Sequence, residues 1–369
     1  MESHLPHNCT NSAEAIAEQT PPHRLEQLAK ESLELARLVA CNPSAPAAIL
    51  KQLSQTRDIP TRSRVASNPN TPPEILLKLS EEFPEAFLAN PALPLLCLEH
   101  PDWLKTRSFK TLKQFLKCDT APAFLLEQLI NHSSLDIRCL VAYHPHTPIP
   151  LLEQLAQGEE TSIQHAIAQN SATPLSLLET LLKDGNDQVR ATTAQNSKLP
   201  RSWLLRLASE GSSQVREGVA ANPQLPPSLA RQLAEDDNPQ VRAALARNPQ
   251  TSAFLLEKLA SDRSMFVCAS VAKHPNAPEA VMMQLARHRS RHVRCSVATN
   301  PNIPISLVEQ LLAENDLDVR KALARNPKTP VTLLRQLVGD RDRYVREGAI
   351  KNLRNQARSR LTASRSLQG

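Results

Sequence analysis

The sequence predicts an all-α fold, an α-solenoid of about twelve 26-residue repeats with two short helices in each repeat. One marker position, usually the Asn of an Asn-Pro pair, recurs every 26 residues at Cys118, His144, Asn170, Asn196, Asn222, Asn248, His274, Asn300, Asn326 and Asn352. A second proline often stands four residues after the marker. The chain has 30 Pro, 7 Gly and 3% aromatic residues, a composition that disfavours a Gly-rich nucleotide site and a β-sandwich.

The residues before the marker predict the first helix of each repeat. A Val or Ile stands seven residues before it, an apolar residue usually three before and Ala two before, as in Val319, Leu323 and Ala324. Spacings of four and five place these residues on one face of a helix of about two turns. The proline after the marker disfavours helical backbone in the residue before it. The first helix therefore ends at the marker, where an Asn amide can bond nearby backbone.

The residues after the marker predict the second helix. Thr stands three residues after the marker and Pro four after, as in Thr147-Pro148 and Thr329-Pro330. Thr is a good N-cap residue, and Pro is tolerated at the first helical position because its missing N–H has no partner there. Paired apolar residues such as Leu333 and Leu334 continue this helix to a polar turn. The two prolines thus end one helix and begin the next.

Departures from the period divide the chain into five segments. We expect a flexible N-terminal segment at 1–24 and a short repeat array at 25–79, marked by Asn42 and Asn68. The register breaks at 80–117, where Asn90-Pro91 comes early, so an irregular, degenerate segment is expected there. The regular array occupies 118–352. Residues 353–369 are expected to be a basic disordered tail.

The repeat unit VRxxxAxNPxTPxxLLxxLAxD resembles the leucine-rich repeat variant family, whose architecture is related to that of HEAT and armadillo α-solenoids. The resemblance is strong over 118–352 and implies a right-handed superhelix of short α and 3₁₀ helices. Some members of the family carry an N-terminal cysteine cluster that holds an iron–sulfur centre. This chain has only Cys9 and Cys41 before residue 90, fewer than the four thiolates such a cluster needs, so no cofactor is expected.

An arginine follows the Val seven residues before the marker in most repeats, at Arg138, Arg190, Arg216, Arg242, Arg294, Arg320 and Arg346. We call this set the arginine ladder. It suits carboxylates or phosphates of a binding partner. Alternatively each arginine pairs within the fold with the acid six residues earlier, and this structural interpretation is favoured because Asp184, Glu210, Asp236, Glu314 and Asp340 follow that spacing. A second cationic cluster, with Arg287, Arg289 and Arg291, is expected to be exposed at a turn.

No catalytic motif stands out, and we expect neither enzymatic activity nor a metal site. Two groups of residues have zinc-ligand chemistry, namely His132, Cys139, His144 and His146, and His288, His292 and Cys295. However, His144 occupies the marker position, Cys139 and Cys295 share one repeat position, and neither group has CxxC spacing. The seven cysteines are scattered and are expected to be reduced thiols.

The function predicted is that of a non-enzymatic scaffold that binds a protein along an extended solenoid surface. The alternative is a HEAT-like solenoid that binds nucleic acid through the arginine ladder. Against the alternative, residues 1–340 hold 35 basic and 35 acidic residues, and the chain has only two Trp and two Tyr for base stacking. No apolar run is long enough to span a membrane, and a cytoplasmic location is expected.

Overall fold

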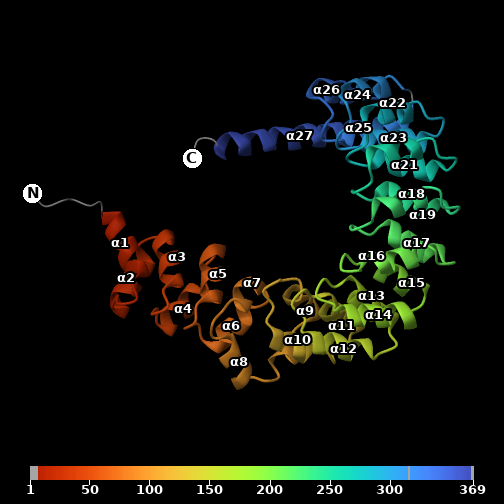
Figure 1. Cartoon of the computed structure of the whole chain (residues 1–369). Helices are drawn as coiled ribbons and strands as arrows, with labels where there is room; N and C mark the ends of the chain where they lie inside the picture. The colour runs from red at the N-terminus through yellow and green to blue at the C-terminus, as the bar shows by residue number, and fades with distance from the viewer. Residues whose placement is uncertain (1–6, 315, 367–369) are drawn as a thin grey trace, which may run out of the picture. The chain divides into compact units, whose positions relative to one another are not determined.

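The computed structural model describes residues 7–314 and 316–366. Within these ranges every regular element is a helix and no strand occurs, which confirms the all-α repeat fold (Figure 1). The chain forms two compact units, residues 1–172 and 173–369.

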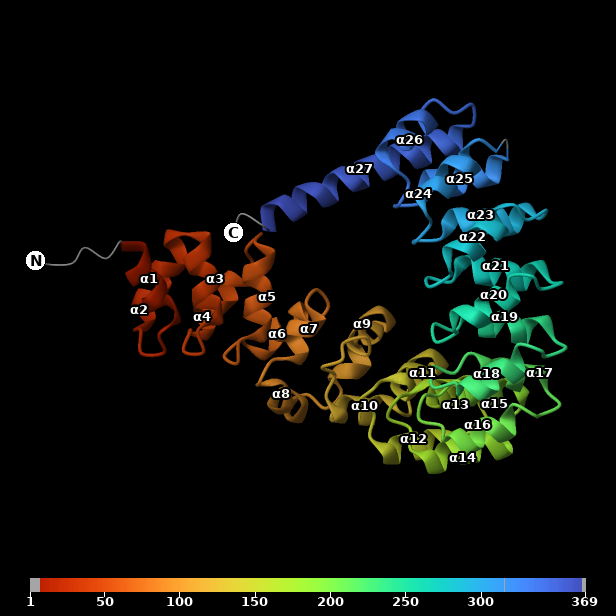
Figure 2. The same ribbon diagram turned by 45° about the horizontal axis from the view of Figure 1, so that its top comes forward.

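The second unit contains regular repeats whose helices form two layers (Figure 2). Each first helix packs against the first helix of the next repeat, and the second helices pack on the first helices beside them. The first helices are α15 (Asp187–Ala194), α17 (Ser213–Ala220), α19 (Pro239–Arg247), α21 (Met265–Lys273), α23 (Arg291–Thr299), α25 (Leu317–Arg325) and α27 (Arg343–Ser366). The second helices are α14 (Leu175–Asp184), α16 (Arg201–Leu207), α18 (Pro227–Leu233), α20 (Ala253–Leu259), α22 (Glu279–Ala286), α24 (Ile305–Leu312) and α26 (Val331–Leu337).

The core of the second unit follows the repeated apolar positions. The Val seven residues before the marker is fully buried in every repeat of this unit, and from Val215 to Val345 it belongs to one continuous cluster with the apolar residues of the second helices. Small residues let the first helices approach closely. A Cβ on Gly218 in α17 would lie 2.1 Å from the carbonyl oxygen of Ala191 in α15. Because no repeat buries both of its faces alone, stability depends on stacking.

The first unit repeats the same two-layer arrangement with less regular spacing. Its first helices are α1 (His7–Ile16), α3 (Leu33–Cys41), α5 (Ile59–Ser67), α7 (Pro84–Leu88), α9 (Phe109–Phe115), α11 (Leu135–Tyr143) and α13 (Thr161–Gln169). Its second helices are α2 (Pro22–Glu31), α4 (Ala47–Leu53), α6 (Pro73–Leu79), α8 (Leu93–Glu99), α10 (Ala123–Leu129) and α12 (Ile149–Ala156). A 3₁₀ helix, η1 (Trp103–Thr106), precedes α9.

The segment 80–117, expected to be irregular, still contains paired helices and a marker asparagine. Asn90 stands 22 residues after Asn68 and takes the marker role, so α7 and α8 form a shortened repeat. The next marker, Cys118, comes 28 residues later, and the extra length is taken up by η1. Phe87, Trp103 and Phe115 pack together here, with ring centroids 5.2 to 5.9 Å apart. Large aromatic rings fill the space left by the changed spacing.

Both ends of the chain differ from expectation within the described residues. Residues 7–16, expected to be flexible, form α1, which packs on α3 and buries Ala15. Residues 353–366, expected to be a disordered tail, continue α27. The physical reason is that Leu353 and Gln356 follow Asn352 at the two positions where every other repeat keeps at least one proline, so nothing forces the helix to end there. Residues 1–6 and 367–369 lie outside the described residues.

The threonine of the linking turn has a different role from the one predicted. In the repeats with Thr147 and Thr329, the residue at the N-cap of the second helix is the following proline, and no side chain caps that helix. The Thr hydroxyl instead donates to a carbonyl near the end of the first helix, at 2.5 Å for Thr147 to Val141 and 2.7 Å for Thr329 to Leu323. Thr therefore satisfies an orphan carbonyl of the helix that ends, rather than a donor of the one that begins.

Candidate functional site

The marker asparagine joins each repeat to the one before it. Asn248 is buried, and its Nδ2 donates to the carbonyls of Ala220 at 2.8 Å and Asn222 at 2.9 Å in the preceding repeat. Its Oδ1 accepts from the N–H of Gln250 at 3.0 Å. The same three bonds are made by Asn42, Asn68, Asn90, Asn170, Asn222, Asn300 and Asn326. The sequence indicated the bond to nearby backbone but not the link to the preceding repeat.

Histidine replaces this amide at two markers. Nε2 of His144 lies 3.1 Å from the carbonyl oxygen of Cys118, and Nδ1 accepts from the N–H of His146. His274 makes the equivalent pair of contacts. These bonds need a neutral ring that carries its proton on Nε2. Burial lowers the pKa of His144, although the bond to Cys118 opposes that effect. The ring is thus held in the form that the link between repeats requires.

The histidines and cysteines considered as zinc ligands are placed by local structure. His132 and His288 each accept an N–H bond at a turn, from Ser134 and Ser290, through Nδ1 at 3.0 Å. Among the described residues, no three His, Cys, Asp or Glu side chains gather in a metal-binding arrangement.

The arginines of the ladder bond groups of the fold itself, as Arg216 illustrates. Arg216 donates through Nε and Nη2 to the carboxylate of Asp236, at 2.7 and 3.0 Å. Its Nη1 donates to the carbonyl oxygen of Glu210 at 2.8 Å. The residue six positions earlier thus contributes its backbone, whereas the paired carboxylate comes from the next turn, 20 residues later. Arg216 thus links two successive turns.

The same connection recurs along the chain. The ladder pairs are Arg138–Glu160, Arg190–Glu210, Arg216–Asp236, Arg242–Asp262, Arg294–Glu314 and Arg320–Asp340. In the N-terminal repeats Arg37 and Arg62 pair with Asp58 and Glu82. Arg346 donates to the carbonyls of Asp340 and Arg341. The geometry therefore favours the structural interpretation of the ladder over a partner-binding one.

Burial differs between the rungs of the ladder. The side chains of Arg242 and Asp262 are 6% and 8% exposed, whereas Glu160 opposite Arg138 is 44% exposed. Burial raises the pKa of Asp262, but the bonds from Arg242 and from the Ser264 N–H outweigh it and leave the pKa lowered. The ionised carboxylate stabilises the fold above the ordinary Asp range, and this stabilisation is lost as pH falls through the lowered pKa.

The second cationic cluster lies at the turn between α22 and α23. Arg287, Arg289 and Arg291 are exposed, as expected. Nη1 of Arg291 lies 3.4 Å from the carboxylate of Asp318. The carbonyls of His288 and Arg289 accept bonds from Arg294 of the ladder. The backbone of this turn therefore bonds the ladder residue Arg294, while the side chains of Arg287, Arg289 and Arg291 face solvent.

A different surface emerges on the first helices from α19 to α27, which we call the first-helix face. The small residues in the middle of these helices, such as Ala243, Ala269, Ser270 and Ser296, are buried and form its floor. One exposed row stands eight residues before each marker and includes Phe266, His292 and Tyr344. A second exposed row stands one residue before each marker and contains Arg247, Lys273, Thr299, Arg325 and Lys351. Seven residues separate the rows, so they run along opposite ends of the stacked helices.

The cationic row was visible in the sequence but was missed. Arg or Lys stands directly before the marker in four of the five repeats from Asn248 to Asn352. Arg247 lies 3.3 Å from Glu217. Within the described chain, no ion pair with an acid is found for Lys273, Arg325 or Lys351. These three cations face solvent uncompensated, in contrast to the arginine ladder.

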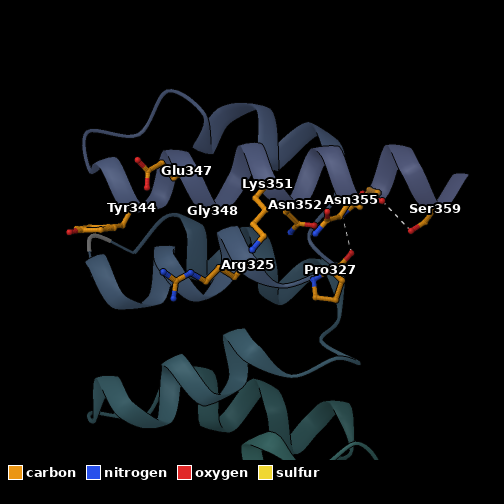
Figure 3. A pocket seen from close by; sticks show the side chains of 10 residues that line it. Arg325, Pro327, Tyr344, Glu347, Gly348, Lys351, Asn352, Asn355 and Ser359 are labelled. Carbon is orange, nitrogen blue, oxygen red and sulfur yellow. Dashed lines mark hydrogen bonds between the residues drawn. The ribbon is translucent and has the colours of Figure 1, made fainter. Parts of the chain in front are cut away.

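The first-helix face deepens into a groove of about 970 Å³ between α25 and α27. Arg325 and Pro327 line one wall, and Tyr344, Lys351 and Asn355 are among the residues that line the other (Figure 3). Lys351 extends from α27 toward α25 and Arg325. The groove exists because α27 continues past Asn352 and covers the turn at Pro327, where Nε2 of Gln356 donates to the Pro327 carbonyl at 3.0 Å. This arrangement can hold an extended anionic segment.

A family model and a solved structure are similar to parts of this chain. The family model described as "Leucine rich repeat variant" matches residues 239–264, which span α19 and α20. A solved structure described as "a leucine-rich repeat variant with a novel repetitive protein structural motif" is 21% identical, covers 59% of this chain and 86% of its own, and superposes with a TM-score of 0.35. No curated protein matches. In the part of the chain that the structure describes, no helix is long and apolar enough to cross a membrane.

Proposed function

We propose that this chain, a helical repeat protein of the leucine rich repeat variant type, is a non-enzymatic scaffold that binds a protein partner through its first-helix face. The observation that carries the proposal is the contrast between two sets of cations. The arginine ladder is bonded within the fold, whereas Lys273, Arg325 and Lys351 stand exposed along one edge of the first-helix face.

The composition of this face fits a protein partner. Exposed Phe266 and Tyr344 stand along its other edge, at 54% and 59% exposure. Aromatic and cationic side chains are the groups enriched where proteins bind one another. A rigid stack of helices also presents them without a large ordering cost on binding. The face therefore offers apolar anchors and charge over several successive repeats.

The nucleic-acid alternative loses its main support. It relied on the arginine ladder, whose guanidinium groups donate to carboxylates and backbone carbonyls. A phosphate would have to displace a bonded, partly buried carboxylate from each rung. We therefore do not propose nucleic acid as the partner. The six cysteines described are free thiols, which supports the reducing, cytoplasmic compartment that we propose.

The proposal is tested by photo-crosslinking in the native cell. A photoreactive amino acid placed at exposed Thr299 lies on the first-helix face, and one at exposed Gln310 lies on a second helix and serves as the matched control. We expect mass spectrometry to identify the same protein adduct repeatedly at position 299 and not at 310. Equal labelling at both positions, or adducts made of nucleic acid, would contradict the proposal.

A further inference from the structure

We propose that the groove between α25 and α27 binds a carboxylate-rich peptide segment that carries an aromatic or apolar side chain. The inference rests on the proposed function, because the groove lies on the first-helix face identified above. It goes further by assigning the chemistry of the segment that the partner must present.

The walls of the groove present unpaired positive charge. Arg325 and Lys351 line opposite walls of the groove; Lys351 extends toward α25, and Arg325 runs along α25 toward the Tyr344 end (Figure 3). The acid that lines the groove, Glu347, is bonded by Arg343 at 2.7 Å. The nearest acid on α25, Asp318, is held by Arg291. Both carboxylates are thus compensated from outside the groove, and the two cations inside it are left to a ligand.

The remaining lining groups favour a peptide over a bare ion. Asn355 adds an amide that can bond a peptide backbone. Tyr344 is 59% exposed at one end, with Nζ of Lys321 5.2 Å from its ring centroid. Its ring offers a flat apolar surface for a side chain of the ligand. The groove therefore combines charge, amide and aromatic contacts along its length.

The number of cations in the groove favours a carboxylate-bearing peptide over a nucleic acid with its phosphate backbone. Nucleic-acid binders neutralise many phosphates in a row, roughly 6 to 10 in well-studied cases. Two cations beside the carboxylate of Glu347 fall short of that number. A guanidinium and an ammonium on facing walls instead suit two carboxylates of one peptide, and an arginine binds a carboxylate in bidentate geometry.

The groove arises from a single departure from the repeat pattern. Every other repeat keeps a proline one or four residues after its marker, whereas Leu353 and Gln356 occupy these positions after Asn352 and let α27 run on beside the turn of the preceding repeat. Gln356 fixes this extension by donating to the carbonyls of Pro327 and Thr329. Gly348 in the floor keeps α27 close to α25, since a Cβ there would lie 3.3 Å from the Cβ of Ala324. The cationic pocket is thus a fixed feature of the last repeat.

The test is fluorescence anisotropy with the full chain and a short labelled peptide made of Glu, Asp and one Phe. The reference peptide replaces each acid by its amide. We expect the acidic peptide to bind, the amide peptide not to bind, and the double variant Arg325→Glu, Lys351→Glu to lose about tenfold or more in affinity. The control variant Lys328→Glu, Arg335→Glu makes the same change in net charge at exposed positions outside the groove, and should bind like the parent.

Each other outcome overturns the inference in a distinct way. Equal binding of the acidic and amide peptides would remove the charge argument while leaving the proposed function intact. An equal loss in the groove and control variants would show that only net charge matters. If the groove variant has no melting transition, and so does not fold, the neutral double variant Arg325→Gln, Lys351→Gln takes its place. This variant must also bind the acidic peptide more weakly than the parent. Competition by an unlabelled RNA oligonucleotide at equal charge would assign the groove to nucleic acid. Failure of the proposed function itself would appear separately, in the crosslinking at Thr299.

Discussion

The regular repeats of the second unit and the 80–117 stretch of the first unit both stack on neighbouring repeats, but different side chains make the contacts between repeats. Both retain the marker amide, because Asn90 bonds the carbonyls of Ala66 and Asn68 just as Asn248 bonds those of Ala220 and Asn222. The regular repeats add the arginine-to-acid rung. The 80–117 stretch has an aromatic cluster, and Arg107 donates from its turn to the carbonyl of Leu77 at 2.9 Å.

Comparing these two regions shows which contact between repeats is kept in both and which contact is replaced. The amide link persists when the spacing falls to 22 residues, so it does not depend on the regular period. In this stretch Pro84 and Leu112 occupy the ladder position, the remaining contact of this kind is Arg107 with Glu81 at 3.9 Å, and buried aromatic area adds to the stacking. We infer that the marker amide is the common link between repeats and that the ladder is an addition to it.

The largest effect is expected in the aromatic cluster. Phe87→Ala removes a fully buried ring that contacts both Trp103 and Phe115, and should lower the free energy of unfolding by about 3–5 kcal/mol. Val271→Ala, at the equivalent position of a regular repeat, removes less buried area and should cost less. Urea unfolding of both variants measures the difference, and a larger loss for Val271→Ala would show that the cluster is not the main support of the 80–117 stretch.

The next effect separates the rungs of the ladder. Arg242→Gln leaves the buried carboxylate of Asp262 without its ion pair and should cost about 3 kcal/mol. Arg138→Gln faces the more exposed Glu160 and should cost less than about 1 kcal/mol. Thermal melts of the two variants check the ranking. Equal shifts in the melting midpoint would mean that burial of the rung does not determine its contribution.

The marker amide should matter equally in both regions. Asn248→Leu and Asn90→Leu each leave buried carbonyls without a donor, and each should cost about 2 kcal/mol. Gln250→Leu, at an exposed position two residues after the marker, is the control and should leave the urea midpoint nearly unchanged. If Asn90→Leu were harmless while Asn248→Leu was not, the link would belong to the regular repeats alone.

The smallest effect concerns pH. The folded pKa of His144 lies below its ordinary value because of burial, so the unfolded chain binds the proton more readily and the wild type loses stability as pH falls through the ordinary His range. His144→Asn supplies the same link without a titrating group and should weaken this loss. Melting midpoints at pH 7.5 and pH 5.5 are compared for both chains, and an identical drop would assign the pH response to other groups.

The sequence predicted the elements better than the links between them. The burial of Val241 and the end of α19 at Asn248 followed from spacing and from proline sterics, which are local. The carboxylate partner of Arg242 was misassigned: Asp236, six residues earlier, accepts through its backbone carbonyl, and the ion pair is with Asp262. The reason is that stacking of the next repeat, which no single repeat encodes, brings the Asp262 carboxylate to the guanidinium, while the Asp236 turn contributes a backbone carbonyl. The groove was missed because it depends on α27 passing the preceding turn, although Leu353 after Asn352 was a readable sign of it.

One measurement tests the central claim, that the arginine ladder holds the fold together and leaves ligand binding to the first-helix face. The triple variant Arg216→Gln, Arg242→Gln, Arg320→Gln is compared with the parent in a thermal melt and in a salt titration with a fluorescent oligonucleotide. We predict a lowered melting temperature and no change in the slope of log K against log salt. An unchanged melting temperature, with a slope flattened by about two to three, would contradict the account, because three phosphate contacts would then have been removed from the surface.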